Sequence, residues 1–181
     1  MKLTFVTGNP DKAKEIEAHI GYPVAQAALD LYEVQSLDIR EIIEAKAREA
    51  YTHLQTPVLV DDAGLALPEL GGLPGPLVKW FIKTISNEGI CRLADQSKER
   101  KALAQVAIGY FDGDNFVPFI AEIPGHISEL PLGQGGYGWD AIFIQEGESR
   151  TRSELSPEEY LANSYRKPLL DNLKSYLLTR A

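Results

Sequence analysis

Two adjacent carboxylates, Asp61 and Asp62, follow directly on the apolar run Val-Leu-Val at residues 58–60. Such a run is typical of a buried central strand, and open α/β sheets bind ligands at the ends of their strands. Neighbouring side chains of a strand point to opposite faces, so one carboxylate can face a metal ion while the other is held by surrounding groups. Carboxylates at a buried edge need a metal ion or a cation nearby. The alternative is a polar strand end that turns at Ala63 and Gly64.

A second candidate is the segment Thr-Gly-Asn-Pro-Asp-Lys at residues 7–12. It links an apolar run that predicts a strand over Leu3–Val6 to a predicted helix over residues 11–20. The glycine permits close approach of the backbone, and N–H groups at the start of a helix can bind phosphate. The glycine spacing and the ending of the segment differ from those of a Walker loop. An ordinary capped helix with a solvated Lys12 is the alternative.

A third candidate combines glycines with two large rings. Residues 133–138 are rich in glycine, and Tyr137, Trp139 and Asp140 lie in or directly after them. Flexible glycines around two rings and an acid suit stacking on a flat base. A buried turn filled by aromatic rings would give the same residues.

The order of the predicted elements indicates the fold class. Helices and strands alternate early and strands pair as hairpins later, which predicts an α/β fold with a central mixed sheet and helices on its faces. A helix is indicated between Asp38 and Leu54, where apolar residues recur at helical spacing. Strands are predicted over residues 102–111 and 116–123, joined by a turn. The other predictions are a loop at 71–76, a short helix with Leu77, Trp80, Phe81 and Ile85 on one side, a strand at 141–144, and a mostly helical end at 156–178 with the apolar stripe Leu169, Leu170, Leu173 and Leu177. One domain over residues 1–181 is expected, because no linker separates parts of the chain.

Composition and charge exclude several classes of protein. The chain has 181 residues, 44% of them hydrophobic, and a formal net charge of -8, which disfavours a nucleic-acid binder. No apolar run approaches the roughly 20 residues that span a bilayer, no signal peptide is indicated, and the single cysteine gives no disulfide. We therefore expect a cytoplasmic protein without a membrane partner. Zinc chemistry is disfavoured because His19, His53 and His126 lack the spacing of metal ligands. Thiol chemistry is disfavoured because Cys91 has no plausible base partner.

In this order the segments resemble the Ham1 family of inosine/xanthosine triphosphate pyrophosphatases. The resemblance runs from Thr7 to Arg166, nearly the whole chain. It is carried by Thr7-Gly8-Asn9 with Lys12, by residues 58–65 with their two aspartates, by the glycine-proline loop 71–76, by Lys79-Trp80-Phe81, and by Gly138-Trp139-Asp140 with Phe143.

The resemblance implies a function and an assembly. It implies a two-lobed fold with the active site in the cleft between the lobes, a homodimer, and Mg2+ as cofactor. The reaction would be hydrolysis of non-standard purine nucleoside triphosphates (ITP, dITP, XTP) to the monophosphate and pyrophosphate, a step that cleans the nucleotide pool. A small-molecule triphosphate would then be the ligand.

The resemblance also assigns roles to residues of this chain. Glu33 and Asp62 would bind Mg2+, and Asp62 would be the base that acts on water, with Asp61 and Lys12 completing the catalytic set. The residues implied in substrate binding are Thr7, Gly8, Asn9, Lys12 and Lys46 for the phosphates, Tyr137 as the stacking ring, and Gly138, Trp139, Asp140, Ser164, Tyr165 and Arg166 around the base.

The chain departs from the family pattern around the base. Tyr165 stands where the family has histidine, and Tyr160 stands where it has lysine. Ala63 and Ala141 replace a serine or threonine and a proline. These departures leave the preferred base open, and they leave open a nucleotide-binding protein of the same fold with altered base specificity or without catalysis.

Overall fold

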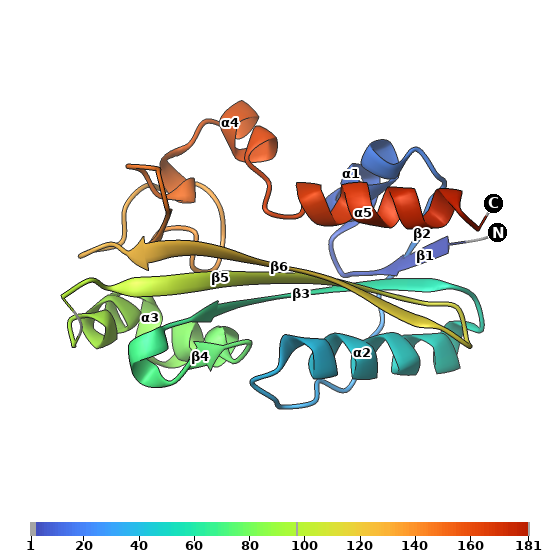
Figure 1. Ribbon diagram of the computed structural model, residues 1–181, viewed down its shortest axis with the longest axis horizontal. Helices are drawn as coiled ribbons and strands as arrows, with labels where there is room; N and C mark the ends of the chain where they lie inside the picture. Colours follow the sequence, from blue (N-terminus) through green and yellow to red (C-terminus); the bar gives the residue numbers. More distant parts are fainter. Residues whose placement is uncertain (1–2, 97, 181) are drawn as a thin grey trace. The chain divides into compact units, whose positions relative to one another are not determined.

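Helices and strands alternate along the part of the chain that the computed structural model describes, residues 3–96 and 98–180 (Figure 1). In chain order the elements are β1 (Leu3–Val6), α1 (Pro10–Ile20), β2 (Val24–Ala27), α2 (Ile39–Leu54), β3 (Val58–Ala66), the 3-10 turn η1 (Pro68–Leu70), β4 (Pro74–Gly75), α3 (Val78–Ala94), β5 (Lys101–Phe111), β6 (Phe116–Ile127), β7 (Phe143–Gln145), the 3-10 turn η2 (Arg152–Glu154), α4 (Pro157–Ala162) and α5 (Lys167–Leu178).

The strands form one seven-stranded sheet in the order β2-β1-β3-β5-β6-β7, with β4 paired to β3. β1 is parallel to both β2 and β3, whereas β4 is antiparallel to β3 and β7 is antiparallel to β6. Figure 1 shows β3 and β5 running in opposite directions. The predicted α/β fold with a mixed sheet is therefore confirmed.

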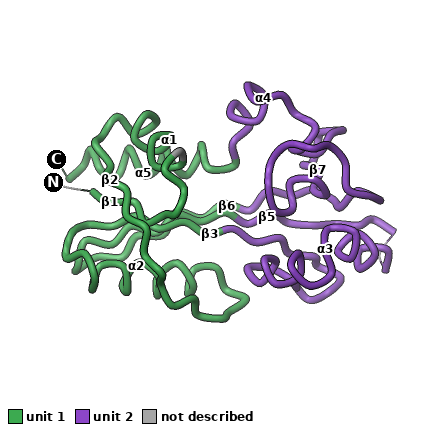
Figure 2. The backbone as a smooth tube through the Cα atoms, turned by 180° about the vertical axis from the view of Figure 1, so that it is seen from behind, with its two compact units in different colours: residues 1–62, 106–121, 165–181 green, residues 63–105, 122–164 purple. Residues whose placement is uncertain are grey.

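The chain divides into two compact units (Figure 2). Unit 1 comprises residues 1–62, 106–121 and 165–181, and unit 2 comprises residues 63–105 and 122–164. The strands β3, β5 and β6 contribute residues to both. The prediction of one domain over the whole chain stays a prediction.

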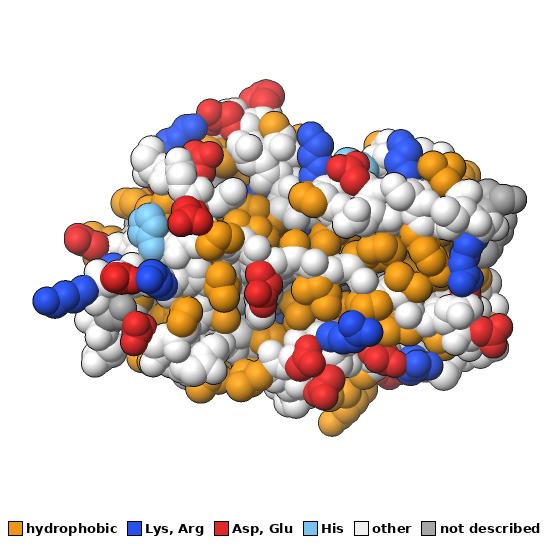
Figure 3. Space-filling view, viewed as in Figure 1, with side chains coloured by type: hydrophobic (Ala, Val, Ile, Leu, Met, Phe, Trp, Pro, Cys, Tyr) orange, Lys and Arg blue, Asp and Glu red, His pale blue; other side chains and the backbone are white. Residues whose placement is uncertain are grey.

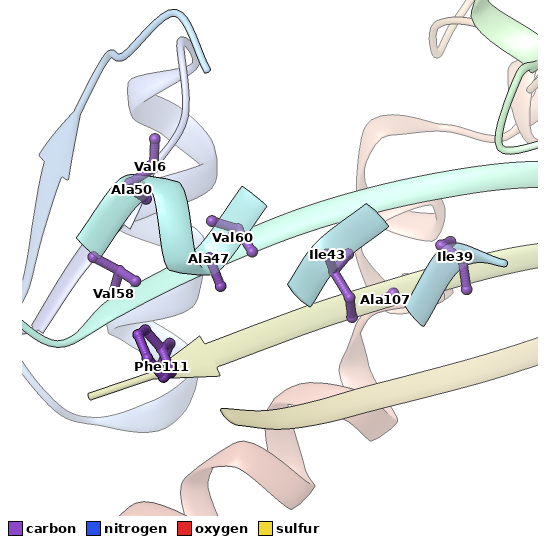
Figure 4. Close-up of a cluster of buried hydrophobic side chains, with 9 residues drawn as sticks. All are labelled: Val6, Ile39, Ile43, Ala47, Ala50, Val58, Val60, Ala107 and Phe111. Carbon is purple, nitrogen blue, oxygen red and sulfur yellow. The ribbon is translucent and has the colours of Figure 1, made fainter. Parts of the chain in front are cut away.

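In unit 1, helix α2 buries one apolar face against the sheet (Figure 4). The helix begins as predicted, because the side chain of Asp38 accepts a hydrogen bond from the N–H of Arg40 and caps its first turn. It ends at Gln55, whose φ of 51° is in the left-handed region. The buried cluster consists of Val6, Ile39, Ile43, Ala47, Ala50, Val58, Val60, Ala107 and Phe111.

Helices α1 and α5 cover the opposite face of the sheet in unit 1 (Figures 1 and 2). The predicted leucine stripe of α5 is confirmed, since Leu169, Leu170, Leu173 and Leu177 are all buried. A hydrogen bond of 2.8 Å between Nε2 of His19 and Oδ1 of Asp171 joins the two helices. The sheet of unit 1 is thus covered by helices on both faces.

Helix α3 in unit 2 differs from the short helix that the sequence predicts. It has 17 residues and bends at Ser86, where φ is 60° and ψ is -177°. Trp80, predicted on the apolar side, is 45% exposed. The other three residues predicted on that side, Leu77, Phe81 and Ile85, are half-buried, so the prediction fails at Trp80 and in the length of the helix. The buried residues of α3 are Val78, Gly89, Ile90, Cys91 and Ala94.

Two further observations concern the surface. Within the described residues, no helix has both the length and the apolar character that crossing a membrane requires. On the face drawn in Figure 3, acidic and basic side chains are interspersed. The expectation that the chain does not bind nucleic acid stays a prediction.

Candidate active site

Asp61 and Asp62 lie inside strand β3 and not at its end. The strand continues to Ala66, so the predicted strand end and the alternative turn at Ala63 and Gly64 are both wrong. Leu65 and Ala66 of β3 pair with β4, which extends the ladder beyond the carboxylates. A Cβ on Gly64 would lie 2.8 Å from the backbone carbon of Gly75, so the glycine permits this close approach.

The carboxylate of Asp61 forms ion pairs with two cationic side chains of unit 1. Its Oδ2 accepts a hydrogen bond from Nζ of Lys12 at 3.0 Å and two from the guanidinium of Arg166, at 3.2 Å from Nε and 2.9 Å from Nη2. The side chain is 11% exposed. Burial alone would raise the pKa of Asp61, but Arg166 and Lys12 outweigh it and hold the pKa below its ordinary value. Asp61 is therefore an ionised carboxylate whose Oδ2 is the common partner of two cations.

The carboxylate of Asp62 is held from the other face of the strand, as the alternation of side chains predicts. Nζ of Lys46 on α2 donates to Oδ2 of Asp62 at 2.9 Å and to the carbonyl oxygen of Asp61 at 3.3 Å. Lys46 directly precedes Ala47, which is fully buried against the sheet. Packing of α2 thus fixes the lysine over the aspartate.

The loop before α1 is tied to β2 and open on one side. The N–H of Thr7 donates to the carbonyl of Ala27 at 2.9 Å, and the amide of Gln26 donates to the carbonyl of Thr7 at 2.7 Å. The N–H of Asn9 donates to Oγ1 of Thr7 at 3.1 Å. No atom lies within 4 Å of a Cβ built on Gly8, so this side of the loop has room for a ligand.

Three cations of unit 1 surround the two aspartates. Lys12 and Arg166 pair with Asp61, and Lys46 pairs with Asp62. Lys12 belongs to the first turns of α1, where the helix dipole adds to the positive potential. An anion such as a phosphate chain suits this arrangement.

The fit of Mg2+ depends on oxygen donors. Among residues 3–96 and 98–180, no group of three or more His, Cys, Asp and Glu side chains is placed to hold a metal ion. Glu33 lies exposed between β2 and α2, and its role as a ligand stays a prediction. Mg2+ at nucleotide sites is bound by one or two carboxylates together with substrate phosphates. The carboxylates of Asp62 and Glu33 fit that chemistry.

In unit 2, residues 135–140 form what we call the aromatic turn. Tyr137 is 58% exposed, as a stacking platform requires, whereas Trp139 is 9% exposed. Trp139 packs edge to face on Phe143, with ring centroids 5.6 Å apart. The exposed Tyr137 is thus suited to stack on a base. The buried Trp139 instead fills the interior of the turn, as the alternative interpretation expects.

Asp140, the last residue of the aromatic turn, is buried. Its Oδ2 accepts hydrogen bonds from the N–H of Tyr137 at 3.0 Å and from the hydroxyl of Tyr160 at 2.8 Å. Nε of Arg152 lies 3.5 Å from its Oδ1. With a residue exposure of 6%, Asp140 holds the turn together. A contact between Asp140 and the base stays a prediction.

The chain segment before α5 carries the last predicted site residues. Ser164 belongs to unit 2 and Tyr165 to unit 1, and both are half-buried. The structure brings Arg166 to Asp61 and Lys12. Contacts of these three residues with a base stay predictions.

Sequence reasoning missed two supports of the aromatic turn, Arg152 and Asn87. Nδ2 of Asn87 on α3 donates to the carbonyl oxygen of Gly138 at 2.9 Å. A signal for Arg152 exists in the sequence, since it follows Thr151 in a Thr-x-x-Glu capping box. No comparable signal marks Asn87, because its place depends on the bend at Ser86.

Comparison with known proteins adds independent evidence. The family model described as the Ham1 family matches residues 3–176. A dITP/XTP pyrophosphatase of Methanopyrus kandleri is 41% identical over 180 residues, covering 97% of this chain and 96% of that protein. Inosine triphosphate pyrophosphatase 2 of Trypanosoma cruzi is 39% identical over 179 residues, covering 97% and 91%.

Solved structures resemble the chain over nearly its whole length. The nucleoside-triphosphatase (dITP/XTP pyrophosphatase) of Mycobacterium abscessus has a TM-score of 0.77 at 28% identity, covering 96% of this chain and 98% of that one. The Ham1 protein of Staphylococcus aureus has a TM-score of 0.85 at 23% identity, covers both chains completely, and supports the fold alone.

Proposed function

Because this chain belongs to the Ham1 family, we propose that it hydrolyses non-standard purine nucleoside triphosphates (ITP, dITP and XTP) to the monophosphate and pyrophosphate, and so cleans the nucleotide pool. The names of its relatives support this substrate class. The observation that carries the proposal is the pairing of Asp61 and Asp62 with Lys12, Lys46 and Arg166 inside unit 1.

Binding of the phosphate chain falls to the cations and the loop before α1. Lys12 and Lys46 have charged heads already directed to the aspartates, so phosphate oxygens can share or take over those contacts. The N–H groups at the start of α1 offer further donors beside Thr7 and Asn9. Fixed cations of this kind stabilise the charge that develops on the phosphates during hydrolysis.

Asp62 is the residue that acts on water. Its carboxylate is half-buried and held by Lys46, an arrangement that orients an acceptor toward a water molecule and lets it take a proton. Asp61 keeps Lys12 and Arg166 in place from the other face of β3. No covalent intermediate is required.

Mg2+ would be held by Asp62 and Glu33 together with phosphate oxygens. When bound, it neutralises charge on the phosphates and lowers the pKa of water. We propose the remaining expectations, a homodimer and a cytoplasmic location, on the resemblance to the family alone.

The base would lie against the exposed ring of Tyr137 in unit 2. Discrimination of a 6-oxo purine from adenine needs donors directed to that oxygen, and a pocket whose polar groups stay unpaired rejects the wrong base. Tyr165 and Tyr160 replace a histidine and a lysine of the family pattern, so we expect any difference in base ranking from the relatives to arise at these two positions.

The direct test is release of pyrophosphate from a panel of nucleoside triphosphates with hypoxanthine, xanthine, adenine and pyrimidine bases, in ribo and deoxy forms. We expect Mg2+-dependent release that is fastest with the 6-oxo purines and stops when the metal is chelated. Binding of these nucleotides without release of pyrophosphate would overturn the proposal in favour of a binding protein without catalysis.

A further inference from the structure

Side chains from α4, α3 and η2 of unit 2 hold the aromatic turn, and those from α4 and α3 donate hydrogen bonds to it. The hydroxyl of Tyr160 on α4 donates to Oδ2 of Asp140 at 2.8 Å, at the end of the turn. The amide of Asn87 on α3 donates to the carbonyl oxygen of Gly138 at 2.9 Å, near its middle. Two residues far apart in the sequence thus hold neighbouring points of one short segment.

The turn needs such supports because of its own sequence. Gly136 and Gly138 have φ values of 68° and 64°, and glycine leaves the backbone free to move among many conformations when nothing holds it. The exposed ring of Tyr137 lies between these glycines. Without external contacts, the ring would not stay in one orientation.

Tyr160 is well suited to hold a carboxylate. The guanidinium carbon of Arg152 lies 4.0 Å from the centroid of its ring, which orients the phenol. Burial and the nearby Asp140 raise the pKa of Tyr160 to about 12, so the hydroxyl remains a donor across the physiological range. Because Oδ2 of Asp140 also accepts from the N–H of Tyr137, the bond from Tyr160 fixes the backbone that carries the exposed ring.

Asn87 is held at an energetic cost. It follows Ser86, whose positive φ is unfavourable for a residue with a Cβ. Within the described residues, Oδ1 of Asn87 is buried without a hydrogen-bond partner, which is unfavourable as well. The bend thus brings the amide of Asn87 to Gly138 and leaves its Oδ1 buried without a partner among the described residues.

We propose that Tyr160 and Asn87 are positioning residues that set the affinity for the base, by holding the aromatic turn so that the Tyr137 ring is fixed for stacking. The inference rests on the proposed function, since it concerns the base of the same substrate. Neither residue touches the phosphates in this scheme. A ring fixed in advance loses less conformational entropy on binding, so its supports act on affinity more than on the chemical step.

The test uses substitutions that keep shape and remove one donor. Tyr160→Phe removes the hydroxyl and keeps the ring under Arg152, and Asn87→Leu removes the amide donor with an uncharged side chain of similar shape. Tyr176→Phe in unit 1 is the matched control, because its buried hydroxyl has no hydrogen-bond partner among the described residues. For each protein we would measure kcat and KM with inosine triphosphate, and the affinity for inosine monophosphate by calorimetry.

We expect each test variant to raise KM and to weaken the affinity for inosine monophosphate about tenfold, the effect of one hydrogen bond to a charged or buried group. We expect kcat to change less than about twofold, and the control to match the wild type. A purely structural role would lower kcat along with thermal stability.

The outcomes separate this inference from the proposed function. Wild-type affinity for inosine monophosphate in both variants would overturn the positioning role, whether or not the enzyme turns over. A wild-type protein that binds inosine monophosphate but releases no pyrophosphate would overturn the proposed function and leave the positioning role standing. Equal losses in the control and the variants would also overturn the positioning role.

Discussion

Arg166 donates two hydrogen bonds to a single oxygen of Asp61, a residue 105 positions earlier in the chain. The contact joins the segment that leads into α5 to the central strand β3. The same oxygen accepts from Lys12, so Asp61 serves as the common partner of two cations. Its role is to hold them in place, and removing it affects both.

The first prediction concerns stability and its dependence on pH. Asp61→Asn should lower the free energy of unfolding by about 3 kcal/mol at neutral pH, because Lys12 and Arg166 lose a buried ionic partner. The pKa of Asp61 is lowered in the folded protein, so its stabilisation is present above the pKa of the unfolded chain and disappears as the pH falls through the folded value. Urea unfolding at about pH 7 and about pH 3 measures this.

Asp114→Asn is the control for this prediction, because Asp114 lies exposed in the turn between β5 and β6. We expect its unfolding free energy to stay within about 0.5 kcal/mol of the wild type. A difference between Asp61→Asn and wild type that stays constant with pH would contradict the assignment of the effect to ionisation.

The second prediction concerns catalysis. Asp62→Asn keeps the shape of the side chain beside Lys46 but removes its charge, so pyrophosphate release should fall by at least about a hundredfold. The melting temperature should fall less than in Asp61→Asn, because Asp62 is more exposed, at 22% against 11%, and Lys46 keeps its bond to the carbonyl oxygen of Asp61. Steady-state assays and thermal unfolding measure the two quantities. Activity near that of wild type would remove Asp62 from the role of base and metal ligand.

The third prediction concerns base preference. Tyr165→His restores the histidine of the family pattern, and it should raise the ratio of kcat/KM for inosine triphosphate to that for adenosine triphosphate about tenfold, as one added hydrogen bond would. Both substrates are assayed with the same enzyme preparation. An unchanged ratio would show that residue 165 does not distinguish the bases.

The fourth prediction compares two glycines of the aromatic turn. Gly136→Ala and Gly138→Ala both place a Cβ on a residue with positive φ, at a cost of about 1 to 2 kcal/mol. Only at position 136 would the Cβ collide, at 2.6 Å from Oδ2 of Asp140, whereas nothing lies within 4 Å at position 138. Gly136→Ala should therefore lower the melting temperature and the affinity for inosine monophosphate further. Equal losses of melting temperature and affinity in the two variants would mean that the side chain of Asp140 moves aside at little cost.

Elements with a strong local signal could be predicted from the sequence. Strand β1, helix α2 and the leucine stripe of α5 were indicated by their patterns of apolar residues alone, and the structure confirms them. Strand β2 was missed, because its four residues Val-Ala-Gln-Ala have little strand preference and are held by pairing with β1.

The end of β3 was predicted wrongly for a different reason. Two aspartates and a glycine are typical of a turn, and nothing near them in the sequence shows that Lys12, Lys46 and Arg166 neutralise the acids inside a strand. For the candidate site, sequence reasoning named these five residues but not their pairing. The contact of Asn87 with the aromatic turn could not be predicted, because it depends on the bend at Ser86, where the sequence has neither proline nor glycine.

The alternation of side chains in β3 makes this stretch sensitive to length. Asp61 meets α1 and Arg166 on one face of the strand, and Asp62 meets α2 on the other. Inserting or deleting one residue between Val58 and Asp61 would exchange the two faces, giving each acid the other's surroundings. Core packing therefore restricts the identity of residues 58–60, and the placement of the two acids restricts their number as well.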